Sequence, residues 1–512
     1  MTHFDVASAA VEAALAAGAT YADARVMHRR YESMNARNGE IEDLTQDEDA
    51  GVGVRALVGS GWGFFAVPDL GRAAALRAGE TATAIARASA SVPYPSRGSH
   101  SSSGSHPNTG PGPHKKPPHS TPPHSKSPDP EFLVPVEART DSWASECLID
   151  PLSVALSTKG DLLTGATGEA HKAGADLAEG LYQVWDTRKW FVSSEGHRID
   201  QHIRESGAGM SATVIGDGET QRRSYPSYRG QYGTRGWELI DELDLNAHAG
   251  RIAEEARALL TAPQCPAVET TLIVGDEQMA LQIHESVGHA IELDRILGWE
   301  AAFAGTSWLD LAKLNSLRYG SELMNITIDP TIPGALGSFG YDDEGTPAQR
   351  RFAVRDGIWV GTLAGRDSAA AAGLDYAGSV RADGWARLPM VRMTNVGLMP
   401  GPHTLDEMIA ATEDGIFMDL NRSWSIDDKR LNFQFGCEIG WEIKRGKLGR
   451  MLRNPTYTGI GPRFWGSMDM LSSEIVPWGT PNCGKGQPGQ IGHTGHPAAP
   501  ARFQGVRVGV RG

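Results

Sequence analysis

The spacing of apolar positions predicts helices at both ends of the first part of the chain, with strands between them. Residues 2–17 and 70–90 are rich in alanine, and each predicts a helix. The apolar runs 51–58 and 61–67 lie on either side of a short turn and predict the two strands of a hairpin. An Asn-Gly pair at 38–39 predicts another tight turn just before them.

The middle of the chain also mixes the two kinds of element. A helix is expected over 170–180, and strand-like pieces occur within 182–216. Residues 239–260 include an alanine-rich amphipathic stretch and predict one or two helices. Two prolines within 263–266 then interrupt the pattern, and we place the main domain boundary there.

The second half opens with a β-branched run at 269–274, which predicts a strand. Asp276 follows and is expected to cap a helix that runs from about 277 to 293. From residue 323 onward the pattern indicates mostly short strands and glycine-rich turns, with a helix near 405–412.

The segment 93–130 differs in kind from the rest of the chain. It consists almost entirely of Ser, Pro, His, Gly and Lys and has no apolar periodicity, which predicts a disordered linker. Its histidines could bind a metal, but they lack regular ligand spacing, so a solvated linker is the preferred interpretation. The segment is either a disordered insertion or a reading-frame error in the underlying gene.

Together these elements predict an α/β (α+β) protein of two domains. A chain of 512 residues is too long for one ordinary core. We expect an N-terminal domain of residues 1–92 and 131–262, built as a helix-flanked sheet. A β-rich C-terminal domain is expected over 263–512.

Composition narrows the classes of partner and the compartment. The formal net charge of −14 disfavours binding to nucleic acid or to an anionic membrane, because the electrostatic contribution would be repulsive. The four cysteines are far apart in sequence, which fits a reducing compartment better than a disulfide framework. No apolar run approaches the ~18 residues that a membrane span requires. The N-terminus lacks the basic start of a signal peptide, so a cytoplasmic protein is expected.

The most informative chemistry lies in the predicted helix, at 284–289. His284 and His289 flank a run that opens with Glu285, a combination that suits a divalent metal with a base beside it. On a regular helix, five steps of about 100° leave the second ring about 140° from the first. Both rings can reach one ion only if the helix is locally widened, and Gly288 tolerates such a distortion.

The motif belongs to a longer segment, 284–294, and further segments follow it in order along the chain. They are 342–348, 388–395, 433–436 and 483–487, and the glycine-rich stretches 51–55 and 61–63 precede the motif. With these segments the chain resembles the TldD/PmbA metallopeptidases, and specifically their TldD-like, metal-binding branch. The resemblance covers nearly the whole chain except about 93–130.

The resemblance implies a zinc peptidase. Carried over by motif, the Zn2+ ligands are His284, His289 and Cys483, and the general base is Glu285. Three protein ligands and one open position are what a catalytic zinc requires. Lys485 lies close to the cysteine in sequence and could favour its thiolate form.

The predicted function is hydrolysis of unfolded or extended peptides, with water activated by zinc and Glu285 as the base. The resemblance also implies a dimer, either of two identical chains or with a PmbA-like subunit that lacks the metal motif. The alternative is a non-catalytic regulatory or partner-binding protein of the gyrase-modulator type. The choice between endo- and exopeptidase, and the substrate-binding residues, remain open.

Several acidic residues lie within the motif segment or after it. On a helix Glu292 would neighbour His289, where it either orients the imidazole or is an ordinary surface carboxylate. The run 343–345 either helps to frame a substrate groove or is a turn whose carboxylates face water, and we assign it no role. Asp294 is interpreted as a structural residue.

Three other residues of the second half could in principle bind the metal. Cys437 is the rival third ligand, although a free cysteine is more often a small buried hydrophobe. His493 and His496 follow Cys483 in the same region. We expect solvated loop histidines there, in preference to groups that compete for the metal.

Overall fold

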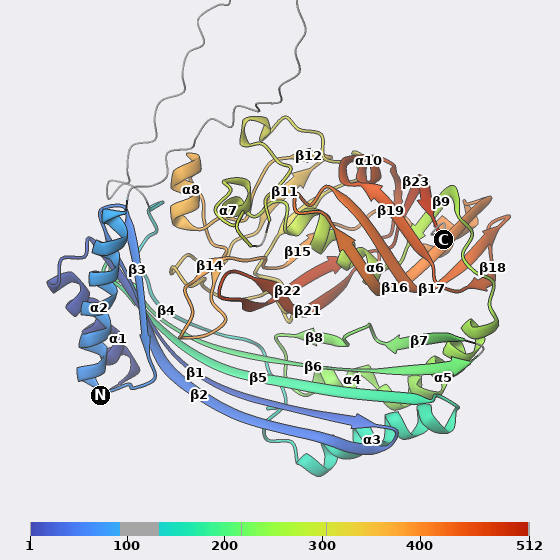
Figure 1. The fold of residues 1–512 in the computed structure, drawn as a ribbon, viewed down its shortest axis with the longest axis horizontal. Helices are drawn as coiled ribbons and strands as arrows, with labels where there is room; N and C mark the ends of the chain where they lie inside the picture. Colours follow the sequence, from blue (N-terminus) through green and yellow to red (C-terminus); the bar gives the residue numbers. More distant parts are fainter. Residues whose placement is uncertain (1, 93–132, 217, 304, 510–512) are drawn as a thin grey trace, which may run out of the picture.

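The computed structural model describes residues 2–92, 133–216, 218–303 and 305–509. An N-terminal sheet with its helices faces a C-terminal set of sheets, so the α/β class is confirmed (Figure 1). The low-complexity segment expected at 93–130 lies outside the described residues. Across those described ranges, none of the helices has the length and apolar character needed to cross a membrane.

The described strands of the N-terminal part form one curved sheet. Its order is β3-β2-β1-β5-β6-β4, and β7 and β8 both pair with β6. The predicted turn at 38–39 joins β1 to β2, and the hairpin predicted from 51–58 and 61–67 is confirmed as β2 and β3. The bounds are β1 Tyr21–Arg37, β2 Glu40–Val58, β3 Gly61–Val67, β4 Thr140–Ala144, β5 Leu177–Ser193, β6 Arg198–Gly216, β7 Glu219–Tyr225 and β8 Gln231–Gly233.

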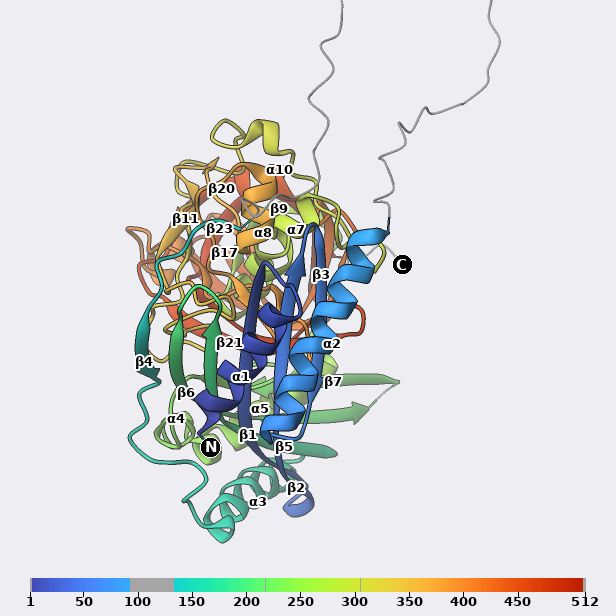
Figure 2. The same cartoon turned by 90° about the vertical axis from the view of Figure 1, so that its left-hand side faces the viewer.

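Helices cover the outer face of this sheet, and α1 and α2 lie side by side along it (Figure 2). Small residues allow the two helices to approach each other closely. A Cβ at Gly79 of α2 would lie only 2.2 Å from the carbonyl oxygen of Ala10 in α1. The helices predicted at 2–17, 70–90 and 239–260 are confirmed. The bounds are α1 His3–Ala16, α2 Arg72–Ser91, α3 Leu156–Lys172, α4 Glu238–Leu243 and α5 Leu245–Thr261.

The helix expected over 170–180 is wrong in its bounds. Helix α3 ends at Lys172, and strand β5 already begins at Leu177. Gly174 has φ of 100°, a left-handed conformation that ends the helix and that glycine adopts without steric cost. The residues after it alternate between the two faces of the sheet and belong to the strand.

In the C-terminal part, the main sheet closes on itself, because β16 pairs with both β9 and β17. The order is β16-β9-β23-β19-β17-β18, with β20 paired to β23. The strand predicted at 269–274 is confirmed as β9. The bounds are β9 Val268–Val274, β16 Asp414–Ile426, β17 Asn432–Lys444, β18 Lys447–Leu452, β19 Thr456–Ile460, β20 Met468–Leu471 and β23 Ala501–Val508.

Shorter elements complete the C-terminal part. A small sheet has the order β12-β11-β10-β15, and two hairpins, β13–β14 and β21–β22, stand beside it. The strands are β10 Ile326–Ile328, β11 Arg351–Arg355, β12 Ile358–Trp359, β13 Val380–Arg381, β14 Met390–Val391, β15 Val396–Leu398, β21 Val476–Lys485 and β22 Gln490–Ala498. The helices and turns are α6 Asp276–Ile283, η2 His284–Gly288, α7 Leu293–Ile296, η3 Leu311–Lys313, α8 Arg366–Ala372, α9 Leu405–Ala410 and α10 Gly461–Gly466.

Helix α6 and the turn η2 are buried in the C-terminal core. Met279, Ile283 and Val287 pack there in one apolar cluster with side chains of the closed sheet such as Leu272 and Phe435. Burial of each such side chain contributes about 1.5–3 kcal/mol. The segment that carries the two histidines is therefore fixed by packing on several sides.

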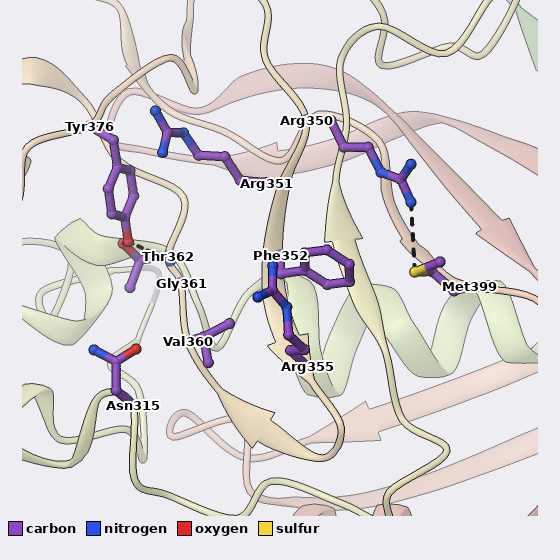
Figure 3. Close-up of a pocket in the computed structure, with 10 residues that line it drawn as sticks. All are labelled: Asn315, Arg350, Arg351, Phe352, Arg355, Val360, Gly361, Thr362, Tyr376 and Met399. Atoms are coloured by element: carbon purple, nitrogen blue, oxygen red, sulfur yellow. Dashed lines mark hydrogen bonds between the residues drawn. The ribbon is translucent and has the colours of Figure 1, made fainter.

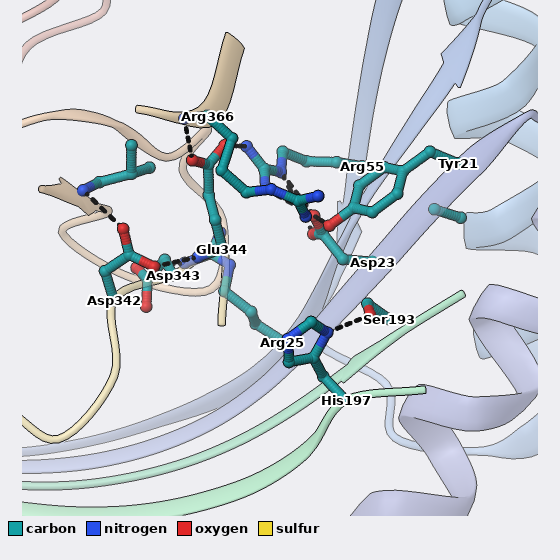
Figure 4. A network of polar contacts seen from close by, with 12 residues as sticks. Tyr21, Asp23, Arg25, Arg55, Ser193, His197, Asp342, Asp343, Glu344 and Arg366 are labelled. Carbon is teal, nitrogen blue, oxygen red and sulfur yellow. Dashed lines mark hydrogen bonds and ion pairs between the residues drawn. The ribbon is translucent and has the colours of Figure 1, made fainter. Parts of the chain in front are cut away.

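A group of buried charges joins the N-terminal sheet to a turn of the C-terminal part (Figure 4). We call it the interface ion network, and its members are Asp23, Arg25, Arg55, Lys189, Asp343 and Glu344. Arg25 donates to Asp343 at 3.0 Å, and Lys189 donates to the other oxygen of the same carboxylate. Arg55 bridges Asp23 of its own sheet and Glu344 across the interface.

The expectation that the 343–345 turn faces water is therefore wrong. Asp343 is 1% exposed and Glu344 is 2% exposed. The cations that pair with them come from strands β1, β2 and β5, far away in sequence. The local sequence indicates only a polar turn. In the folded chain, this turn forms buried ion pairs that connect the N-terminal and C-terminal parts.

Candidate metal centre

The chain passes from strand β9 into helix α6 at Gly275, which brings the histidine pair into the core. Gly275 is the N-cap and Asp276 is the first helical residue, so the expected cap is wrong by one position. A Cβ at Gly275 would lie 2.2 Å from Oδ1 of Asp419. The close approach of β16 therefore requires glycine at the start of this helix.

The helix widens at the two histidines. Residues 284–288 form a π-type turn, in which the N–H of His289 donates to the carbonyl of His284 at 3.1 Å. One turn of this kind takes five residues, so both rings lie on the same side, with centroids 4.8 Å apart. The distortion expected near Gly288 is confirmed.

Packing is a second reason why residue 288 is a glycine. A Cβ at Gly288 would lie 2.1 Å from Sδ of Met393, so any larger residue would displace that side chain. The regular helix expected as far as residue 293 ends early, since Glu292 has an extended backbone with ψ of 118°. The short helix α7 starts after it.

Cys483 reaches the two histidines from strand β21. Its Sγ lies 3.7 Å from Nε2 of His289, and one ligand atom from each of the three residues lies within 4.8 Å of the others. All three residues are buried. Within the described part of the chain, this is the one group of potential ligands found at such distances, and Cys437, the rival third ligand, is not in it.

Hydrogen bonds fix which ring nitrogen of each histidine is free. Nδ1 of His289 lies 2.9 Å from the carboxylate of Glu292, which can only accept, so this nitrogen carries the proton. Nδ1 of His496 lies 3.0 Å from the carbonyl oxygen of Val396, so its Nε2 has a lone pair. This Nε2 lies 2.8 Å from Nδ1 of His284 and 3.1 Å from the hydroxyl of Thr494, and we assign the shorter contact as a hydrogen bond donated by His284. Both histidines of the motif are left with unprotonated Nε2 atoms.

The electrostatics favour the forms that bind metal. Burial lowers the pKa of His284 and of His289, which keeps both imidazoles neutral. Burial by itself would raise the pKa of Cys483, but His289 and the guanidinium of Arg392 outweigh it and lower the pKa. A neutral imidazole and a thiolate are the states that coordinate a metal ion.

Lys485 does not act on the cysteine in the way expected from its position in sequence. Its ammonium group donates to both carboxylate oxygens of Asp294, at 2.8 and 2.9 Å, and lies 3.3 Å from Glu292. Burial by itself would raise the pKa of Glu292, but Lys485 and Arg295 hold it well below its ordinary value. The carboxylate that orients His289 is therefore itself held ionised by two cations.

Glu285, the predicted base, lies on the π-type turn and is 6% exposed. Nη1 of Arg430 donates to its Oε2 at 2.9 Å. Arg430 belongs to the turn between β16 and β17 and has φ of 61°. The carboxylate is thus held in one orientation by an element that is distant in sequence.

The expectation of solvated loop histidines after Cys483 is wrong for both residues. His493 and His496 lie on strand β22. His493 pairs with Glu205 at 3.0 Å and stands edge-on to Trp185, whereas His496 is completely buried behind His284. The two histidines are three residues apart and therefore point to opposite faces of the strand, but this stretch of Gly, Thr and Pro does not look like a strand in the sequence.

Replacing His496 with alanine is expected to weaken metal binding about 10–100-fold, because His284 loses the acceptor that fixes its tautomer. Titration with zinc against a chelator of known affinity measures this. His493→Ala is the matched control, since His493 is on the same strand and does not touch either ligand; its affinity should equal that of the unmodified protein. Equal affinities in all three proteins would contradict the assigned hydrogen bond.

Comparison with known proteins agrees with this architecture. Residues 268–509 match the family model of the PmbA/TldA metallopeptidase C-terminal domain, and residues 22–86 match domain 1 of the same family. A metalloprotease of Methanocaldococcus jannaschii is 26% identical over 439 residues, which are 86% of each chain. A zinc metalloprotease TldD homolog of Saccharolobus solfataricus is 24% identical over 238 residues, 46% of this chain and 51% of the relative.

Solved structures show the same fold. The crystal structure of a proposed modulator of a DNA gyrase from Thermotoga maritima superposes with a TM-score of 0.73 at 16% identity, over 99% of this chain and 100% of that one. Because two domain models of the family match it, over 268–509 and 22–86, the chain belongs to the TldD/PmbA metallopeptidase family.

Proposed function

We propose that the protein is a zinc-dependent peptidase that hydrolyses unfolded or extended peptides, with Glu285 as its general base. The observation that carries this proposal is the convergence of His284, His289 and Cys483, whose ligand atoms lie within 4.8 Å of one another. The relatives named as metalloproteases, one of them as a zinc metalloprotease, support the same activity.

The three side chains fit a zinc ion by chemistry and by spacing. Imidazole nitrogen and thiolate sulfur are preferred zinc ligands, and a tetrahedral site places such a nitrogen and sulfur about 3.5 Å apart. The observed distance from His289 Nε2 to Cys483 Sγ is 3.7 Å. When bound, zinc with two neutral ligands and one thiolate supplies Lewis acidity to a carbonyl group and to water.

The residues of the chain supply the proton transfers and the geometry. Glu285 accepts a proton from the attacking water and then returns it to the leaving amine, as a general base and then a general acid. Arg430 keeps the carboxylate of Glu285 in place through its hydrogen bond. Glu292 and His496 hold the two imidazoles through their Nδ1 atoms, which leaves the Nε2 atom of each available to a metal.

Burial of the centre is the reason for proposing unfolded substrates. His284, Glu285, His289 and Cys483 are each at most 6% exposed, so a folded domain cannot bring a peptide bond to them. A cleft of about 730 Å³ lies between the concave face of the N-terminal sheet and the β21–β22 hairpin, and Asn482, the neighbour of Cys483, lines it. An extended peptide in that cleft could add to the hairpin through backbone hydrogen bonds.

Metal removal tests the proposal. The purified protein is expected to carry about one zinc per chain. Chelation should abolish cleavage of an unstructured peptide, and added zinc should restore it. Cys483→Ala should lose the metal and the activity, whereas Cys437→Ala, at the other buried cysteine, should keep both. A protein that carries no metal and cleaves no peptide would instead favour the non-catalytic, partner-binding alternative.

The pairing with a second subunit, identical or lacking the metal motif, belongs to the same proposal. Measuring the mass of the protein in solution, alone and mixed with a relative that lacks the metal motif, tests whether such a pair forms.

A further inference from the structure

A pocket of about 750 Å³ opens on the C-terminal part, beside strand β11 (Figure 3). None of the side chains of the metal centre lines it. The residues that line it are Asn315, Arg350, Arg351, Phe352, Arg355, Val360, Gly361, Thr362, Tyr376 and Met399. Its volume lies within the range of about 300–1,000 Å³ that is typical of sites for small molecules.

The charge of this pocket is opposite to that of the chain. Arg350, Arg351 and Arg355 line it and no acidic residue does, although the chain has 62 acidic and 48 basic residues. Arg350 is weakly paired, with its Nε 3.7 Å from Asp329. Among the described residues, neither of the other two arginines has a carboxylate within ion-pair distance.

Aromatic rings hold the arginines in place. The guanidinium of Arg351 lies over the ring of Tyr376 at 4.7 Å, and that of Arg355 lies over Phe352 at 4.3 Å. Stacking fixes the plane of a guanidinium group while its edge remains available for hydrogen bonds. The Tyr376 hydroxyl is itself held, because it accepts from the backbone N–H of Thr362 at 3.0 Å.

One donor in the pocket lacks an acceptor. Nε of Arg351 is buried and has no hydrogen-bond partner, whereas its Nη2 donates to Gln349 at 3.0 Å. A buried donor without an acceptor costs about 1–3 kcal/mol, and an anionic ligand would remove that cost. Together with the unpaired guanidinium group of Arg355 in the same pocket, this donor of Arg351 points to an anion with several acceptor oxygens.

We infer that this arginine pocket binds a small ligand that carries at least two phosphate groups. Two unpaired guanidinium groups require a ligand with two or more negative charges, and each guanidinium fork matches the oxygens of one phosphate. The rings of Tyr376 and Phe352 are each engaged by one of these arginines, so we expect the phosphates to be recognised in preference to a nucleobase. Recognition therefore rests on the phosphates, and a free polyphosphate and a nucleoside triphosphate should bind equally well.

Calorimetric titration of the full-length protein with tripolyphosphate, ATP and adenosine tests the inference. Tripolyphosphate and ATP should bind with Kd values within about threefold of each other, and adenosine should not bind. Arg351→Gln and Arg355→Gln should each weaken tripolyphosphate at least about tenfold, as expected for the loss of a charge-assisted hydrogen bond. Arg77→Gln is the matched control: it removes one charge from the exposed side of α2 and should change Kd less than twofold.

Three results would overturn the inference. The first is the absence of tripolyphosphate binding at millimolar concentration. The second is equal weakening by Arg351→Gln and Arg77→Gln, which would show a nonspecific effect of charge or binding at another place, including the metal centre. The third is binding of an acidic peptide that tripolyphosphate cannot displace. Thermal midpoints of the variants establish that each is folded, and the outcome does not depend on peptidase activity.

Discussion

Replacing Glu285 with glutamine is expected to lower kcat for peptide cleavage roughly 10²–10⁴-fold while zinc remains bound, because an amide cannot accept the proton of the attacking water. Glutamine has nearly the volume of glutamate and still offers an oxygen to Arg430, so the turn between β16 and β17 should keep its place. Initial rates on an unstructured peptide, together with the zinc content of the same samples, measure both halves of the expectation.

Glu277 provides the matched control on the same helical segment. Burial raises the pKa of Glu277 to about 8, so its side chain is mostly uncharged at neutral pH, and Glu277→Gln changes little. It should keep the rate of the unmodified enzyme. Full activity in Glu285→Gln would refute the assignment of the base, and equal losses in both variants would point to a general disturbance of α6.

Replacing Asp343 with asparagine is expected to lower the free energy of unfolding by about 3–5 kcal/mol, because it leaves Lys189 and Arg25 buried without their counterion. Chemical denaturation followed by separate probes in the two parts measures the loss and shows whether the parts begin to unfold separately. Asp414→Asn is the control, since Asp414 forms an exposed pair with Lys444. It should change the stability by less than about 0.5 kcal/mol.

The same carboxylate gives a pH dependence with a definite sign. Burial by itself would raise the pKa of Asp343, but Lys189 and Arg25 outweigh it and lower the pKa from 3.8 to about 2. The unfolded chain has the ordinary value, so the stabilisation is complete above pH 3.8 and is lost as pH falls toward 2. The difference in stability between the unmodified protein and Asp343→Asn should therefore shrink over that interval. A difference that stays constant there would contradict the ion pairing.

The sequence was most informative where the determinants are local. The strand at 269–274, the Asn-Gly turn at 38–39 and the alanine-rich helices follow from apolar spacing and turn chemistry within a few residues. The distortion near Gly288 could also be foreseen, because the geometry of a regular helix does not allow His284 and His289 to face one ion.

Contacts between distant segments could not be foreseen in the same way. His496 lies 212 residues from His284 in sequence, and Arg430 lies 145 residues from Glu285. Nothing in the residues around His496 distinguishes a strand from a loop, so its burial depends on the pairing of β21 with β22. Asp343 likewise became a buried ion only because β1 and β5 bring cations to it.

The π-type turn also bears on how chains of this kind tolerate insertions and deletions. A five-residue turn equals an α-helical turn with one residue inserted, and it separates a segment that follows β9 from one that continues into α7. Deleting Val287 would restore the four-residue spacing of ordinary zinc-peptidase helices. Because the π-type turn already takes up the extra residue, His289 and Glu292 would keep nearly the same rotation about the helix axis after this deletion. The pairing of Glu292 with His289 could then be kept, and the cost would fall on the chain that continues into α7, which would be one residue shorter where Glu292 meets Lys485.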